Sequence, residues 1–101
     1  DGGEHLIFVD VRSPAEYAAD HIAGSVLIPL TDIEADIGLK HLAELALANP
    51  GATLVLYCQT GPRAVRAYQR LQAVGWDDTG NYVVLRGGIE AWRAVEPARS
   101  P

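Results

Sequence analysis

Short apolar runs alternate along this chain with segments whose apolar residues recur at helical spacing. Each run is partly β-branched or aromatic and is bounded by turn formers, which predicts a buried strand. The four runs are Leu6–Val9, Val26–Ile28, Thr53–Tyr57 and Tyr82–Leu85. Because strands and helices alternate, the pattern predicts a central parallel sheet with helices on both faces, a three-layer α/β/α fold.

The first half of the chain carries two helix-start signals. Ser13-Pro14-Ala15-Glu16 combines an N-cap residue, a proline at the first helical position and a capping-box glutamate. It predicts a short helix from about Pro14 to Asp20. A second capping box over residues 31–34 precedes leucines at helical spacing, and it predicts a helix that ends at the Asn49-Pro50-Gly51 turn.

Two further helices are predicted in the second half. One begins at about Arg63 and ends at Gly75. Its apolar residues are expected on one face, and they are Val65, Tyr68, Leu71 and Val74. The last helix follows Gly87-Gly88 and passes through Trp92. We expect both Trp76 and Trp92 to pack in the core or at its edge.

Length and composition are those of a single globular domain. The chain has 101 residues, of which 49% are hydrophobic and 21% charged. We expect one domain over residues 1–96 and a tail over residues 97–101. The net charge of −5 and the scattered basic residues argue against nucleic-acid binding. No apolar run approaches the roughly 18 residues of a membrane span.

Cys58 is the only cysteine in the chain. One thiol can form no internal disulfide and cannot supply the several ligands of a zinc or iron–sulfur site. We therefore expect no metal ion and no cofactor, and a reducing cytoplasm is the expected compartment. For such a lone cysteine, the alternative to a functional role is an inert buried thiol.

The loop after the third predicted strand has the features of an anion site. Cys58 lies at the strand end where open parallel sheets bind ligands, and a helix begins a few residues later. Backbone amides and the positive end of the helix dipole are expected to face the loop centre, where they would stabilise a thiolate or a persulfide anion. Pro62 has no N–H to contribute. The contributing amides are expected to be those of Gln59, Thr60, Gly61, Arg63 and Ala64.

Four motifs resemble those of rhodanese-family sulfurtransferases. The active-site loop of that family, C-x-x-G-x-R-S/A, is similar to Cys58–Ala64. Its N-terminal signature resembles Asp10-Val11-Arg12, Glu16-Tyr17 and His21–Ser25, and its C-terminal signature resembles Gly87-Gly88-Ile89-x-x-Trp92. The resemblance implies the rhodanese-like fold. It also implies a further strand before the first one seen here, which we expect outside this segment, so the chain is expected to be one module of a larger protein.

The resemblance implies transfer of a sulfane sulfur in two steps. A donor such as thiosulfate would leave its outer sulfur on Cys58 as a persulfide, and a thiophilic acceptor such as cyanide or a thiol would remove it. Three alternatives remain: a sulfur-relay module that passes persulfide between partner proteins, a non-catalytic binding module, and a cysteine-dependent phosphatase or arsenate reductase. Related phosphatases have five residues between cysteine and arginine, whereas four separate Cys58 from Arg63. The shorter loop favours sulfur transfer.

Charged and polar residues near this loop have competing interpretations. Asp10 and Arg12 are predicted to form an ion pair that fixes the first strand-to-helix turn, and Arg12 is also a candidate to bind the thiosulfate dianion. Arg63 is expected either to face the substrate or to tie the loop down. Glu16 is predicted to be a capping residue. His21 is predicted to tie its segment to a neighbouring backbone group, since a thiolate stabilised by amides needs no histidine.

Overall fold

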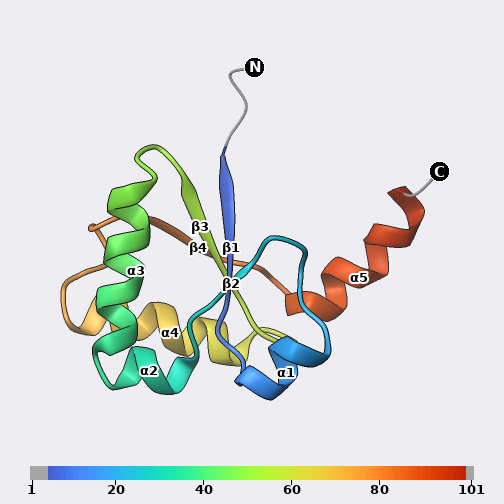
Figure 1. Cartoon of the computed structure of the whole chain (residues 1–101), viewed down its shortest axis with the longest axis horizontal. Coiled ribbons are helices and arrows are strands. Elements are labelled where there is room, and N and C mark those ends of the chain that lie inside the picture. The colour runs from blue at the N-terminus through green and yellow to red at the C-terminus, as the bar shows by residue number, and fades with distance from the viewer. Residues whose placement is uncertain (1–4, 100–101) are drawn as a thin grey trace.

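A parallel sheet lies at the centre of the structure, a computed structural model that describes residues 5–99 (Figure 1). Its strands are β1 Leu6–Asp10, β2 Val26–Leu27, β3 Thr53–Tyr57 and β4 Asn81–Val84. They are ordered β2-β1-β3-β4, and all three neighbouring pairs are parallel. The predicted sheet is confirmed, and every strand end lies within one residue of its expected place. A further strand before β1 stays a prediction.

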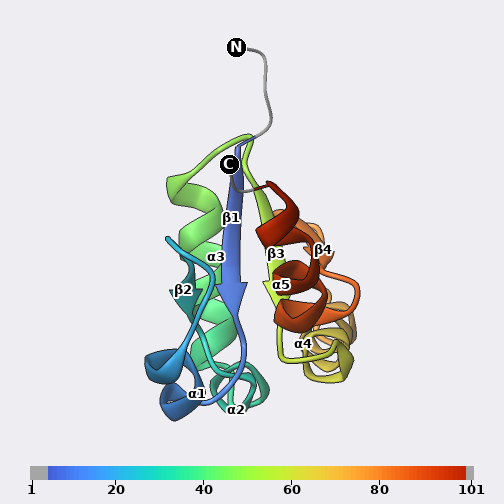
Figure 2. The same cartoon turned by 90° about the vertical axis from the view of Figure 1, so that its right-hand side faces the viewer.

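Helices cover both faces of the sheet. Their bounds are α1 Pro14–Ala19, α2 Leu30–Glu34, α3 Ile37–Ala48, α4 Pro62–Ala73 and α5 Gly88–Arg99. Helices α3 and α5 lie on opposite sides of the strands (Figures 1 and 2). A large core joins one face to α2, α3 and α4. A smaller core joins the other face to α5 and contains Ile22, Tyr57 and Ile89, with Phe8 and Trp92 packed against it. The three predicted layers and the packing of Trp92 are therefore confirmed.

The alternation of side chains along β3 determines toward which face of the sheet the Cys58 side chain points. Leu54, Leu56 and Cys58 belong to the large core, whereas Tyr57 belongs to the small one. Because successive strand residues point to opposite faces, Cys58 leaves the strand on the side that α4 covers.

The helix predicted from residue 31 is in fact two helices. Helix α2 begins at Leu30 after Pro29, which makes no side-chain cap hydrogen bond, so the predicted capping box over residues 31–34 is wrong. The chain then turns through Asp36, with φ of 74°, and α3 begins. A Cβ on Gly38 would lie 2.5 Å from the Ile33 backbone nitrogen. The helical conformation is therefore interrupted here, and α2 and α3 each pack an apolar face. Gly38 permits the close approach of the two helices.

Three apolar residues are more exposed than predicted. Val26 is 37% exposed because β2 is a short edge strand. Val65 is 43% exposed, since α4 turns Ala64, Ala67 and Leu71 toward the sheet instead. Trp76 follows the end of α4, is 39% exposed and belongs to neither core, so the expected packing in the core is wrong for it, and packing at the core edge stays a prediction.

Helix α5 is longer than predicted. It runs through Arg99, so residues 97–99 are helical where a tail was expected, because an internal proline removes one hydrogen bond without necessarily ending a helix. Residues 100–101, and residues 1–4 of the predicted domain, lie outside the described residues. Within residues 5–99, no helix is long and apolar enough to cross a membrane.

Tyr57 joins the end of β3 to the segment between α1 and β2. The ring is fully buried. Its hydroxyl accepts a hydrogen bond from the Ile22 amide at 3.0 Å and donates one to Ser25 Oγ at 3.1 Å. Burial raises the pKa of Tyr57, so the hydroxyl stays protonated and able to donate.

We expect Tyr57→Phe to lower the free energy of unfolding by about 1–3 kcal/mol, because it leaves a buried backbone amide without its acceptor. Urea denaturation measures this. Tyr68→Phe is the matched control, since that half-buried ring has no hydroxyl partner within the described residues. Equal losses in the two variants would contradict the role assigned to Tyr57.

Candidate active site

Cys58 lies directly after β3 at the carboxyl edge of the sheet. The residue is 1% exposed. The amide of Gly61 donates a hydrogen bond to its Sγ at 3.0 Å. The loop therefore folds back over the sulfur, and one of the predicted loop amides contacts it directly.

The first turn of α5 holds the carbonyls of this loop. The Cys58 carbonyl accepts from the Ile89 amide at 2.9 Å, and the Gln59 carbonyl accepts from the Glu90 amide at 3.2 Å. In a trans peptide the N–H points opposite to the preceding C=O. The amides of Gln59 and Thr60 therefore point away from α5, and neither finds a backbone acceptor among residues 5–99, so both can face a ligand on the other side of the loop.

This contact requires a glycine at position 88. Gly88 has φ of 65°, and a Cβ built on it would lie 2.5 Å from the carbonyl oxygens of both Cys58 and Gln59. Real side chains do not tolerate such a distance to backbone atoms. Gly88 is thus a loop-positioning residue, a role more specific than the turn suggested by the sequence.

Helix α4 presents its amino terminus to the same loop. Gly61 is the N-cap, with φ of 133°, and Pro62 begins the helix. The amides of Arg63 and Ala64 find no backbone acceptor among residues 5–99. First-turn amides of this kind carry the positive end of the helix dipole and favour an anion nearby.

Arg63 is tied to α1 by a bidentate ion pair. Its Nη1 and Nη2 lie 2.7 and 2.9 Å from Oε1 and Oε2 of Glu16. Glu16 also completes the predicted capping box with Ser13. The hydrogen bonds from Arg63 are the main reason that the pKa of Glu16 falls from 4.5 to about 2. Contact of Arg63 with a substrate stays a prediction.

Arg12 is buried and bound on all sides by the protein. It is 4% exposed and forms an ion pair with Asp10 at 2.8 Å, which confirms the predicted turn-fixing pair. Its Nη1 donates to the Gln59 side-chain oxygen at 3.0 Å, and its Nη2 donates to the Asp20 carbonyl. Arg12 therefore connects the first turn to the cysteine loop. Direct binding of a substrate by Arg12 stays a prediction.

His21 has the structural role predicted for it. Its Nδ1 lies 2.7 Å from the Tyr17 carbonyl, and its ring stacks on the Tyr17 ring with centroids 3.8 Å apart. The histidine therefore stabilises the end of α1.

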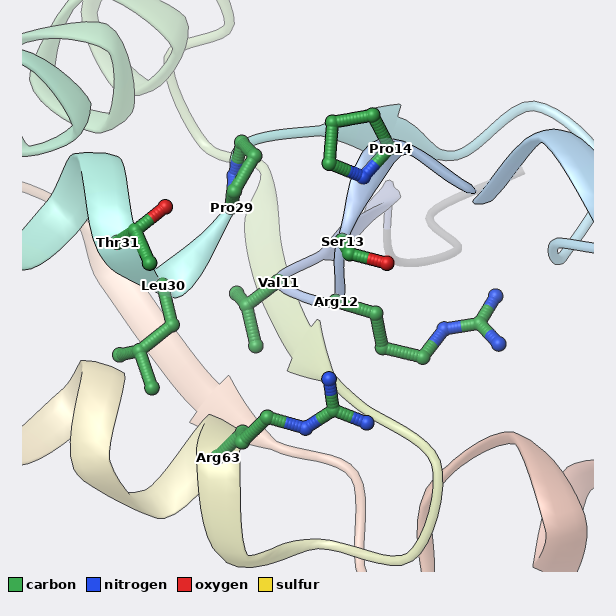
Figure 3. A pocket seen from close by; sticks show the side chains of 8 residues that line it. All are labelled: Val11, Arg12, Ser13, Pro14, Pro29, Leu30, Thr31 and Arg63. Carbon is green, nitrogen blue, oxygen red and sulfur yellow. The ribbon is translucent and has the colours of Figure 1, made fainter. Parts of the chain in front are cut away.

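Two cavities adjoin the cysteine loop and the start of α4. One of about 160 Å³ lies beside the β1–α1 turn, where Arg12 and Arg63 extend from different elements toward one region (Figure 3). The other, of about 470 Å³, lies between the loop and the segment after β4. Its lining residues are Thr60, Gly61, Pro62, Val65, Val84, Leu85, Arg86 and Gly87. This second cavity was not predicted, because its two walls are far apart in the sequence.

We expect the stabilising effect of Glu16 to be lost in acid. Its carboxylate has a lowered pKa when folded, so its contribution is present above pH 4.5 and is lost as the pH falls toward about 2. Glu16→Gln should therefore be less stable than wild type above pH 4.5, and the difference should shrink toward pH 2. Because both side chains of the pair are about one-third exposed, solvent screening limits the difference to about 1 kcal/mol.

Urea denaturation across this pH range measures the effect. Glu44→Gln is the control, since Glu44 is exposed and has no ion-pair partner within residues 5–99. A difference between wild type and Glu16→Gln that does not change with pH would contradict the assignment.

Comparison with known proteins shows the family. The Rhodanese-like domain model matches residues 1–95. The chain is 39% identical over 92 residues to the probable adenylyltransferase/sulfurtransferase MoeZ of Mycobacterium tuberculosis, covering 91% of this chain and 21% of that protein. It is 32% identical over 93 residues to the human thiosulfate:glutathione sulfurtransferase, covering 86% of this chain and 78% of that protein.

A solved structure supports the same fold. Saccharomyces cerevisiae Ygr203w, described as a homologue of single-domain rhodanese and of the Cdc25 phosphatase catalytic domain, matches with a TM-score of 0.74 and 21% identity. The match covers 93% of this chain and 68% of that one. Together with the match over residues 1–95, the parallel sheet and the cysteine loop at its carboxyl edge identify the chain as a member of the rhodanese-like domain family.

Proposed function

We propose that this chain is a sulfurtransferase in which Cys58 carries a sulfane sulfur between a donor and a thiophilic acceptor. The observation that carries the proposal is the hydrogen bond from the Gly61 amide to Cys58 Sγ at 3.0 Å, at the amino terminus of α4. A backbone donor beside a helix amino terminus stabilises a thiolate, which is the nucleophilic form of cysteine. An inert core thiol needs neither feature.

The first half-reaction forms the persulfide. The Cys58 thiolate attacks the outer sulfur of thiosulfate, the bond between the two thiosulfate sulfurs breaks, and sulfite leaves with its electron pair. In the second half-reaction cyanide or a thiolate attacks the outer sulfur of the persulfide, and the Cys58 thiolate is regenerated. Charge and sulfur balance in both steps, so the cycle requires no metal or redox cofactor.

The geometry of the loop supports the persulfide stage of this cycle. Four amides of the loop and of the first turn of α4 find no backbone acceptor among residues 5–99, and they are suited to hold the outer sulfur anion: those of Gln59, Thr60, Arg63 and Ala64. Relatives named sulfurtransferases include a human enzyme whose name specifies thiosulfate and glutathione.

A sulfur-relay module is the second candidate. The chain spans about a fifth of the MoeZ protein, whose name joins an adenylyltransferase to a sulfurtransferase. In a protein of that kind, Cys58 would receive sulfur from a partner protein and pass it to a carrier. Efficient transfer from a protein persulfide, together with negligible turnover of thiosulfate, would favour this candidate.

We expect incubation with thiosulfate to add about 32 Da to the intact protein, as one sulfur atom on Cys58. Cyanide should remove this mass and release thiocyanate. Intact mass spectrometry before and after cyanide measures both steps, and Cys58→Ser should show neither. Failure of thiosulfate and of every protein or small-molecule persulfide to form the adduct would show that Cys58 is an inert buried thiol.

We expect Gly88→Ala to reduce the rate of persulfide formation at least about tenfold, because its Cβ would push the Cys58 and Gln59 carbonyls off the first turn of α5. Gly75→Ala is the matched control. Gly75 has a similar φ of 77° but no atom within 4 Å of the added Cβ. Both variants carry the same kind of backbone strain, roughly 1 kcal/mol, so equal rates in the two would contradict the positioning role.

A further inference from the structure

Arg86 is the one arginine described in atomic detail that lacks a partner. Each of the others forms an ion pair, namely Arg12, Arg63, Arg66, Arg70 and Arg93. Arg86 is exposed and has no hydrogen-bond or ion-pair partner within residues 5–99. In a chain with net charge −5, such a free guanidinium is available to an anion from outside.

The position of Arg86 connects it to the cysteine loop. It lies after β4 and lines the cavity of about 470 Å³ together with Thr60, Gly61 and Pro62. Gly61 is the residue whose amide contacts Cys58 Sγ at 3.0 Å. A molecule in this cavity therefore lies against the same loop that holds the sulfur.

The residues that line the cavity and its volume indicate which kind of molecule fits it. Three apolar residues also line it, namely Val65, Val84 and Leu85. The volume is within the range of about 300–1,000 Å³ that small organic ligands occupy. An inorganic dianion has no apolar surface to pack against these side chains. An organic acid has a carbon skeleton that can pack there and a carboxylate that can accept a bidentate guanidinium contact.

We propose that this cavity docks an organic thiol acceptor that carries a carboxylate, and that Arg86 is the specificity residue that binds the carboxylate. The inference rests on the proposed function. The thiolate of the docked molecule attacks the outer sulfur of the Cys58 persulfide, a new sulfur–sulfur bond forms on the acceptor, and the electron pair of the broken bond returns to Cys58 Sγ. Arg86 takes no part in bond making.

Single-turnover discharge of the persulfide tests the proposal with a pair of matched thiols. The thiols are 3-mercaptopropionate, which carries a carboxylate, and 2-mercaptoethanol, which is neutral. After loading with thiosulfate, mass spectrometry follows loss of the added sulfur. We expect Arg86→Gln to slow discharge by 3-mercaptopropionate about three- to fivefold, the range of an exposed ion pair, and to leave discharge by 2-mercaptoethanol unchanged.

Two controls isolate the guanidinium. Lys40→Gln removes one exposed positive charge from α3, away from this cavity, and should leave both rates unchanged. Arg86→Lys should keep part of the preference for the carboxylate, because the charge remains while the bidentate geometry is lost. Thiocyanate released by cyanide verifies that every variant carries the persulfide.

A binding measurement separates this inference from the proposed function. The thioether 3-(methylthio)propionate cannot accept sulfur, and we expect Arg86→Gln to weaken its binding to the thiol form about three- to fivefold, as measured by NMR titration. Absence of any persulfide with intact binding would overturn the sulfur-transfer chemistry and keep the anion site. A persulfide whose discharge ignores Arg86 would overturn the inference alone, as would slower loading from thiosulfate with unchanged discharge, which would assign Arg86 to the inorganic donor.

Discussion

The conformation of the cysteine loop depends on hydrogen bonds between two of its carbonyls and the first turn of α5. The carbonyls of Cys58 and Gln59 accept hydrogen bonds from the Ile89 and Glu90 amides. This contact turns the following amides the other way, toward the side on which Cys58 leaves β3. The amino termini of α5 and α4 thus both face this loop, and they contact it differently. Helix α5 binds loop carbonyls, and α4 leaves its first-turn amides for an anion. Gly88 is what permits the approach, because any larger residue would collide with both carbonyl oxygens.

Side-chain contacts hold the loop from the remaining directions. The buried Arg12 reaches from the first turn to the side chain of Gln59, and the more exposed Arg63 is held by Glu16 on α1. These two arginines differ in physical character. The pair of Arg63 and Glu16 is screened by water and contributes modestly to stability. Arg12 is buried with Asp10 as its counter-charge, so removal of the Asp10 carboxylate would leave a buried charge without compensation. Both arginines therefore support the loop without either having to touch the transferred sulfur.

Much of the fold could be predicted because its signals are local. Each strand is a continuous apolar run, and the start of α1 is determined by Ser13 and Glu16 within one turn. The interruption between α2 and α3 could not be predicted, because it results from packing of Gly38 against the Ile33 backbone.

In the site, the position of Cys58 after a strand and before a helix followed from the sequence. The contact of Arg63 with Glu16 bridges 47 residues and has no local signal. The same holds for the capture of the loop by α5 and for the cavity beside Arg86, each of which joins segments that only the fold brings together.

Because these 101 residues contain one cysteine, the charges around the site affect which acceptor can approach Cys58. A persulfide on Cys58 could not be resolved by a second thiol within these 101 residues, so the acceptor would have to approach from outside this domain. The protein is acidic overall, and a thiolate or persulfide adds further negative charge at the loop, so anionic acceptors are repelled unless a local cation offsets that field. Main-chain dipoles would stabilise a sulfur anion on Cys58 in the proposed cycle, but they would not distinguish one acceptor from another. We therefore propose that selection among acceptors comes from a side chain that lines the cavity, and within the described part of the chain Arg86 is the cation there that no carboxylate already holds. The two proposals thus assign stabilisation of the sulfur anion to backbone amides and the choice of acceptor to the side chain of Arg86.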